Sequence, residues 1–169
     1  MGVADKVLKD LNLTVDGYGF AGNIEEFKPP KLVLKTEDHR AGGMDSSVPI
    51  EMGMEALESS FILTGHFPEV LTKWGVSVGE KTQLTARGSL ESYDGSVIPV
   101  VVNLRGIITE IEDGTWKPGE KNNQTFSMKL EYYKREQNGV VLHEIDIPNM
   151  KRFINGTDQL AERRNSLGL

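Results

Sequence analysis

The chain contains few residues that could carry out catalysis together. Its three histidines, His39, His66 and His143, lie far apart and lack the spacing typical of a metal site. Carboxylate pairs such as Glu25-Glu26 and Glu112-Asp113 point apart on a strand or sit in a turn, so we interpret them as solvated charges. Glycine-rich phosphate loops and nucleophile motifs are absent from the sequence. We therefore expect that the chain is no enzyme and uses no cofactor and no metal ion.

Trp116 is a candidate for binding a sugar or a protein partner. It stands in a polar turn, Glu112 to Glu120, rather than in an apolar pattern. Such a tryptophan could be a platform for a sugar, an anchor in a protein interface, or a lid folded back over its own sheet. A sugar site would also draw on Tyr132 and Tyr133. The sequence leaves these three interpretations open.

Composition narrows the class of protein further. A length of 169 residues suits one domain, and the net charge of -6 argues against a general binder of nucleic acid or anionic membrane. The absence of cysteine excludes disulfides and thiolate zinc sites. The first ten residues form no apolar segment, and the longest apolar runs are only a few residues. We therefore expect neither a secretory signal nor insertion into a membrane.

Alternating polarity predicts four long β-strands, over residues 84–93, 97–111, 124–134 and 140–147. Asp94-Gly95 and Asn138-Gly139 separate them in pairs, and both dipeptides are typical of two-residue type I′ turns. The alternation places Tyr132 inside and Tyr133 outside. One face of the sheet is therefore polar and hydrated. It could bind a ligand, line a lumen or simply face solvent. Strands this long also invite pairing with other chains.

Two segments show helical spacing. Residues 67–75 begin with a proline at the first helical position and end at Gly75, and Phe67, Val70, Leu71 and Trp74 share one face. This pattern predicts a helix that covers one open side of the sheet. A weaker pattern over residues 3–11 predicts a short N-terminal helix.

The segment from Thr36 to Glu58 changes phase partway along. Apolar side chains occupy even positions from Val48 to Met54 and odd positions from Leu57 onward. Because a strand alternates its faces, the change predicts a bulge, a twist or a move to a different neighbour. We interpret it as a strand that serves two surfaces, one of which belongs to another copy of the chain.

Taken in order, these segments resemble one family, the tail-tube proteins of contractile phage tails and of the related R-type bacteriocins (tailocins). The resemblance covers nearly the whole chain. It rests on the order and spacing of these motifs: Pro30-Lys31-Leu32, His39-Arg40-Ala41-Gly42-Gly43-Met44-Asp45, Met52-Gly53-Met54-Glu55-Ala56-Leu57-Glu58, Leu104-Arg105-Gly106, Trp116-Lys117-Pro118-Gly119-Glu120, Tyr132-Tyr133-Lys134, Glu144-Ile145-Asp146, Ile154-Asn155-Gly156-Thr157-Asp158-Gln159-Leu160 and Leu167-Gly168-Leu169.

The resemblance implies a mainly β (α+β) fold, a β-sandwich or partial β-barrel with one flanking helix. It implies one tail-tube domain over residues 1–169, with an N-terminal arm of about residues 1–12 and a C-terminal arm of about residues 154–169. Six copies would form a ring, and their long hairpins would join into a shared barrel. Stacked rings would make a hollow tube, which a contracting sheath drives through the envelope of a target cell.

The resemblance also implies partners and contact residues. Besides itself, the chain would meet a tail sheath, a baseplate or tube initiator, a tape-measure protein and, in a phage, DNA in transit. The particle would assemble in the bacterial cytoplasm and leave on lysis. Contacts between rings and subunits would involve Arg40, Gly42, Gly43, Met44, Asp45, Ser47, Trp116, Leu167 and Leu169, and charges facing the sheath or a neighbour would be Asp158, Glu162, Arg163 and Arg164.

Two other functions remain open at this point. A secreted ring related to type VI secretion tubes would look much the same in sequence. A carbohydrate-binding β-sandwich could use Trp116 with Tyr132 and Tyr133.

Overall fold

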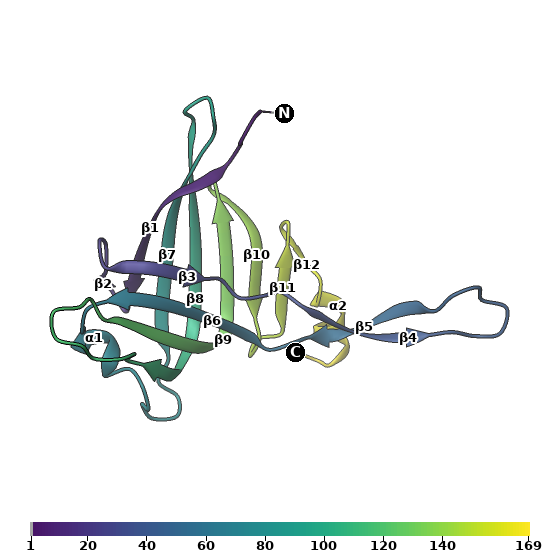
Figure 1. The fold of residues 1–169 in the computed structure, drawn as a ribbon. Coiled ribbons are helices and arrows are strands. Elements are labelled where there is room, and N and C mark those ends of the chain that lie inside the picture. The colour runs from purple at the N-terminus through teal and green to yellow at the C-terminus, as the bar shows by residue number, and fades with distance from the viewer. Residues whose placement is uncertain (1) are drawn as a thin grey trace.

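The computed structural model describes residues 2–169, and Figure 1 shows that most of them form β-strands. The predicted mainly β fold is confirmed. In chain order the elements are β1 (Val7–Val15), β2 (Tyr18–Gly19), β3 (Ile24–Lys28), β4 (Leu34–His39), β5 (Val48–Met54), β6 (Leu57–Thr64), α1 (Pro68–Leu71), β7 (Thr82–Glu91), β8 (Val97–Glu112), β9 (Asn123–Gln137), β10 (Val140–Asp146), β11 (Lys151–Ile154), β12 (Thr157–Asp158) and α2 (Ala161–Ser166).

The main sheet is antiparallel and divides at β9. Its strands follow the order β12-β11-β10-β9-β8-β7-β1-β2. One edge of β9 pairs with β8 along its length, while the other pairs first with β6 and then with β10. Strand β3 continues the sheet beyond β6, and β3 and β6 cross in front of β7 to β10 in Figure 1. The sheet thus curls back over itself into a partial barrel.

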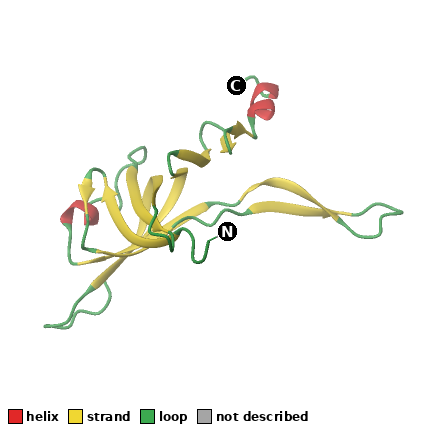
Figure 2. Cartoon of the chain, turned by 90° about the horizontal axis from the view of Figure 1, so that it is seen from above, coloured by secondary structure: helices red, strands yellow, loops and turns green. Residues whose placement is uncertain are grey.

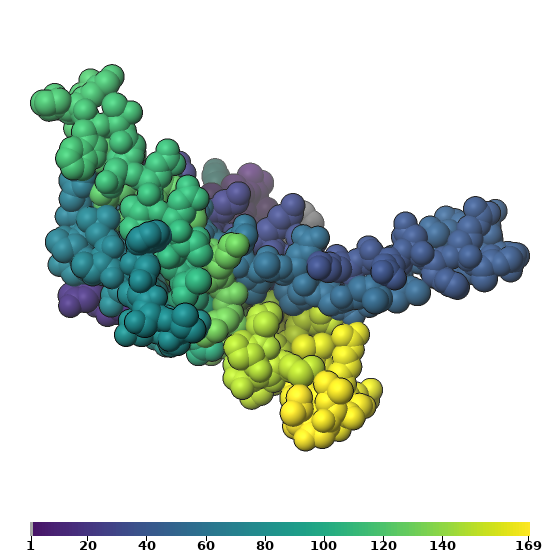
Figure 3. Space-filling model, turned by 90° about the horizontal axis from the view of Figure 1, so that it is seen from below, coloured from purple at the N-terminus to yellow at the C-terminus, as the bar shows by residue number. Residues whose placement is uncertain are grey.

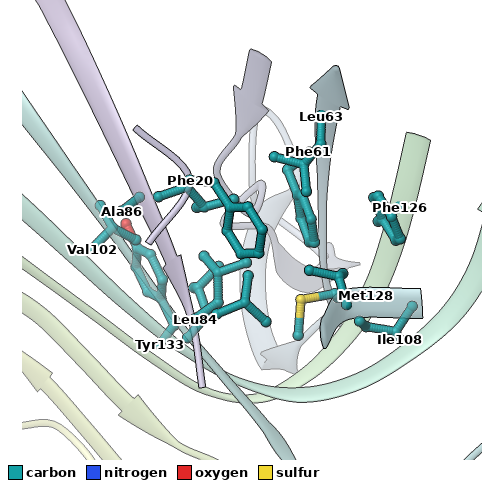
Figure 4. Packing of buried hydrophobic residues seen from close by; sticks show 14 of the residues in the cluster. Phe20, Phe61, Leu63, Leu84, Ala86, Val102, Ile108, Phe126, Met128 and Tyr133 are labelled. Atoms are coloured by element: carbon teal, nitrogen blue, oxygen red, sulfur yellow. The ribbon is translucent and has the colours of Figure 1, made fainter. Parts of the chain in front are cut away.

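The hydrophobic core fills the space inside this curl, as Figure 4 shows. Phe61 of β6 and Phe126 of β9 stack with their ring centroids 4.9 Å apart, and Phe20 meets Phe67 edge to face at the same distance. Val70 of α1 is fully buried against the same cluster. Burial of these side chains is the main stabilising contribution to the fold.

A bulge in β9 reverses the predicted orientation of Tyr133. Arg105 pairs with Tyr132 and Gly106 pairs with Leu130, so Glu131 is the extra residue. The alternation therefore changes phase at this point, and Tyr133 turns into the core, where only 2% of its surface is exposed. The prediction that Tyr133 faces outward is wrong.

The N-terminal helix predicted over residues 3–11 is also wrong. Residues from Val7 onward form β1, which pairs antiparallel with β7. Backbone hydrogen bonds to β7 outweigh a weak helical preference. Gly88 of β7 makes room for this strand, because a Cβ atom there would lie 2.7 Å from the Cδ1 atom of Leu8.

The predicted helix over residues 67–75 is present only as the short α1. Trp74, expected in its buried face, is 57% exposed, and its indole N–H donates a hydrogen bond to the carbonyl of Thr109 at 2.9 Å. Pairing with the end of β8 replaces the last helical turn, since Trp74 also forms a β-bridge with Ile108. The second helix, α2, was not predicted.

The two predicted hairpin turns differ in outcome. Asn138 and Gly139 both have positive φ, of 53° and 77°, as a type I′ turn requires. At the other turn only Gly95 has positive φ, 88°, and β7 and β8 are joined by the five residues 92–96. There the carboxylate of Asp94 accepts hydrogen bonds from the backbone and hydroxyl of Ser96, so the type I′ prediction is wrong for this hairpin.

Candidate assembly surfaces

The largest projection of the molecule is the hairpin of β4 and β5, which forms a two-stranded sheet of its own. Figures 1 and 2 show it extending well beyond the main sheet. The change of phase in the sequence marks its base, because β5 ends at Met54 and β6 begins at Leu57 in the main sheet. Between them, the N–H of Glu55 donates to the carbonyl of Val33 at 2.9 Å. Two strands thus replace the single strand that we predicted.

One face of this hairpin is apolar and exposed. Val48, Ile50 and Met52 alternate along β5 and are each about half exposed. Residues directly opposite each other in an antiparallel pair share a face, so Glu37, which pairs with Ile50, and His39, which pairs with Val48, lie among them. We name Glu37, His39, Val48, Ile50 and Met52 the outer face of the hairpin. Exposed apolar groups gathered in this way mark an interaction surface.

The opposite face is held by the C-terminal part of the same chain. Glu51 accepts hydrogen bonds from Arg152 of β11 and from Arg163 of α2, each at 2.9 Å. The side chains of Glu51 and Arg152 are largely buried, whereas that of Arg163 is more exposed. A carboxylate shared by two guanidinium groups is a strong, oriented contact. It sets the direction in which the hairpin leaves the sheet.

Titration of Glu51 should report this contact. The hydrogen bond from Arg152, and after it that from Arg163, holds the pKa of the Glu51 carboxyl below its ordinary value of 4.5. The contact is therefore complete above pH 4.5 and is lost as the pH falls through the lowered pKa. We expect the carboxyl-carbon NMR shift of Glu51 to titrate with a midpoint below 4.5, and Arg152→Gln to raise that midpoint. A wild-type midpoint at or above 4.5 would contradict the assignment.

The predicted contact residues Arg40, Gly42, Gly43, Met44, Asp45 and Ser47 all lie at the tip of the hairpin. The tip is closed by local bonds, since the Nε atom of Arg40 donates to the carbonyl of Met44 at 3.2 Å and the N–H of Met44 donates to the carbonyl of Ala41. Gly43 has a φ of 86°, which an L side chain adopts only with strain. The structure brings these six residues together, and their contacts with a neighbour remain a prediction.

The predicted C-terminal charges are placed around α2. Asp158 and Arg164 pair with each other at 2.8 Å, and Arg164 also donates to the carbonyl of Met150. These two residues thus already have partners within the chain, as does Arg163 through Glu51. Glu162 is exposed, and Leu167 and Leu169 are exposed beyond the end of α2.

Trp116 lies far from the hairpin. Its loop projects from the opposite end of the molecule in Figure 3, where the green loop and the blue hairpin point apart. The indole is 70% exposed and rests edge to face on His66, with ring centroids 5.6 Å apart. His66 in turn contacts Gln124 at 2.9 Å. One chain therefore offers two separate projecting surfaces.

The described residues form no arrangement typical of a metal or membrane protein. Over residues 2–169, no three histidine, aspartate or glutamate side chains gather in a way that could hold a metal ion. None of the helices in this range is long and apolar enough to cross a membrane.

Comparison with known proteins decides the family. The family model for phage tail tube protein FII matches residues 5–168 of the chain. The chain belongs to this tail tube family. The tail tube protein of Escherichia phage P2 is 32% identical over 166 residues, covering 96% of each chain. The major tail tube protein of Serratia phage KSP20 is 35% identical over 168 residues, covering 97% of this chain and 96% of its own.

Solved structures agree on the fold. A chain of the anti-feeding prophage cap matches with a TM-score of 0.61 and 14% identity, over 80% of this chain and 94% of that one. A chain of the PVC sheath-tube complex in its extended state matches with a TM-score of 0.57 and 11% identity, over 75% and 87%. This tail tube family member is thus a structural subunit of a phage-type tail tube, and its family is not enzymatic.

Two features of the tail tube chain were not predicted from sequence. The first is the anchoring role of Glu51, whose partners Arg152 and Arg163 are about a hundred residues away. The second is the position of Arg135 at the mouth of the core, where its Nε atom is buried. An arginine on the inward side of β9, in line with Tyr133, could have been noticed only if the bulge at Glu131 had been anticipated.

Proposed function

We propose that six copies of the chain form a ring and that rings stack into the hollow inner tube of a contractile injection system. The observation that carries the proposal is the β4–β5 hairpin, which is fixed in direction by Glu51 and exposes an apolar face far from its own core. An isolated molecule gains nothing from such a projection. A neighbouring copy would bury this apolar face, and the buried contact would stabilise the assembly.

The polar side of the main sheet fits a wall of this tube. Its charges pair along the strands: Glu131 accepts from Arg105 at 3.0 Å, and Lys134 lies 3.0 Å from Glu136. A ring of six copies carries six times -6, or -36 charges. Phage DNA would be repelled by such a ring and would slide through it without binding.

The particle and its partners follow from the same proposal. The tube would be surrounded by a sheath, and the PVC chain that shares this fold comes from a complex of sheath and tube. Assembly of the tube would start on a baseplate or tube initiator, and a tape-measure protein would set the length of the tube. It would belong to a phage virion or a headless bacteriocin, assemble in the cytoplasm and be released by lysis.

Mass and shape test the proposal. Purified protein should sediment as a ring of about 112 kDa, which is six times 18.7 kDa, or as longer polymers, and negative-stain images should show rings or hollow tubes. Expression with the sheath and baseplate should increase the yield of tubes. Protein that stays at 18.7 kDa under all conditions and never enters particles would reject it.

The same preparations also distinguish two alternative functions from the proposed one. A type VI-like ring would appear as free rings in the culture medium of intact cells. A carbohydrate site has lost one of its three aromatic residues, because the ring of Tyr133 is buried in the core. Glycan binding that disappears in Trp116→Ala would restore that interpretation.

A further inference from the structure

An apolar groove opens at the mouth of the core, between β1, β3 and the neighbouring strands. Leu8 and Leu11 of β1, Phe27 of β3, Leu90 of β7 and Val100 of β8 are among the residues that line it. A second hollow continues past Leu8, Leu11 and Phe27 along β3. The first hollow has one charged residue in its lining, Arg135 of β9.

Arg135 has an unused hydrogen-bond donor. Its Nε atom is buried and has no partner among residues 2–169, and none of the ion pairs in that range includes this arginine. Burying a charged donor without an acceptor is unfavourable. His143, opposite Arg135 in the register with β10, is no anionic partner, because an imidazole is either neutral or positive, and burial and then the charge of Arg135 lower its pKa and favour the neutral ring. The groove is therefore apolar, with one positive group, whose Nε atom has no acceptor although its side chain also meets that of Tyr133.

The outer face of the hairpin has the complementary composition. Val48, Ile50 and Met52 supply exposed apolar side chains, and Glu37 places one carboxylate among them. Glu37 is exposed and takes part in no ion pair over residues 2–169. An acid within an apolar strip thus matches an arginine within an apolar groove.

The hairpin cannot reach the groove of its own chain. Glu51 holds its opposite face against β11 and α2, and the hairpin points away from β1 and β7 in Figure 1. A hairpin that enters this groove must therefore belong to a second copy of the chain.

We propose that the outer face of one hairpin lies in the groove of a neighbouring copy, where the carboxylate of Glu37 pairs with the guanidinium of Arg135. This contact rests on the proposed tube and specifies where the hairpin binds. It buries the apolar strip and places a carboxylate beside the one arginine that lines the groove. A paired charge in a desolvated setting also fixes the register of one copy on the next.

Charge reversal tests the pairing. We expect Glu37→Arg to raise the protein concentration needed for tube formation by roughly tenfold or more, since it places two positive charges together. Asp38→Arg is the matched control, because Asp38 pairs with Pro49 on the other face of the hairpin. The double variant Glu37→Arg with Arg135→Glu should bring the concentration back to within a few-fold of the wild type.

Cross-linking gives a second measurement that does not depend on Arg135→Glu folding. The chain has no cysteine, so Glu37→Cys and Leu8→Cys in one chain can be joined by a short bismaleimide without side reactions. We expect covalent ladders from assembled tubes, and few from the control pair Asp38→Cys with Leu8→Cys. Wild-type assembly by Glu37→Arg, or equal ladders from both pairs, would overturn the contact and leave the tube intact. A wild-type chain that never assembles would overturn both.

Discussion

Replacing Gly106 with alanine is expected to destabilise the folded chain severely. A Cβ atom at this position would lie 2.0 Å from the carbonyl oxygen of Lys129 and 2.8 Å from the Cα atom of Leu130. Both are backbone atoms of the paired strand β9, so no side chain can rotate away to make room. The two central strands would have to separate at the bulge, where β8 and β9 are already out of regular register. We expect a loss of roughly 3 kcal/mol or more, the upper end for overpacking.

Urea unfolding followed by circular dichroism measures this loss. Because domains of this size are stable by about 5–15 kcal/mol, a loss of this size should lower the urea midpoint strongly and, near the lower end of that range, leave a small fraction of the chain unfolded. Gly19→Ala is the matched control, since Gly19 has no heavy atom within 4 Å of an added Cβ and does not have positive φ. Equal midpoints for the two variants would show that β9 can shift away from β8.

Replacing Ile50 with aspartate is expected to abolish tube formation and leave the folded chain intact. Ile50 is 46% exposed and lies in the middle of the outer face, so a second carboxylate beside Glu37 would be buried against any neighbour. Within the single chain it would remain in water, and the unfolding free energy should change by less than about 0.5 kcal/mol.

Sedimentation and electron microscopy would show monomers in place of tubes. Val78→Asp is the control, because Val78 is a fully exposed aliphatic residue in the loop after α1 and receives the same change in charge. Ile50→Val should assemble as the wild type does. Normal tubes from Ile50→Asp would mean that the hairpin makes no apolar contact.

The sequence predicted the long strands well, because sustained alternation of polarity is typical of a strand with one buried face. The turn at Asn138-Gly139 followed from the conformations that these two residues allow. The turn at Asp94-Gly95 did not, since Asp94 bonds to Ser96 and stabilises a longer loop. The residue types at these two sites predict that the chain turns there, but they do not predict the length of the loop.

The errors share a cause, which is contact between distant segments. Residues 7–11 form a strand because β7 offers them hydrogen bonds, although their own pattern is weakly helical. Tyr133 is buried because one extra residue in β9, opposite Arg105 and Gly106, changes the phase of the strand. The tip of the hairpin was identified by resemblance, whereas its anchor at Glu51 depends on arginines far along the chain. Pairing of this kind becomes visible only in three dimensions.

The hairpin and the groove lie on different parts of the subunit, so their contact has a direction. In the proposed tube each copy would offer a hairpin to one neighbour and receive a hairpin from another, which would make the interface heterologous. A stack built by such contacts has unlike ends, one with empty grooves and one with bare hairpins. Two different proteins could then start growth at one end and cap the other. The polymer would be polar, and its partners could distinguish its two ends.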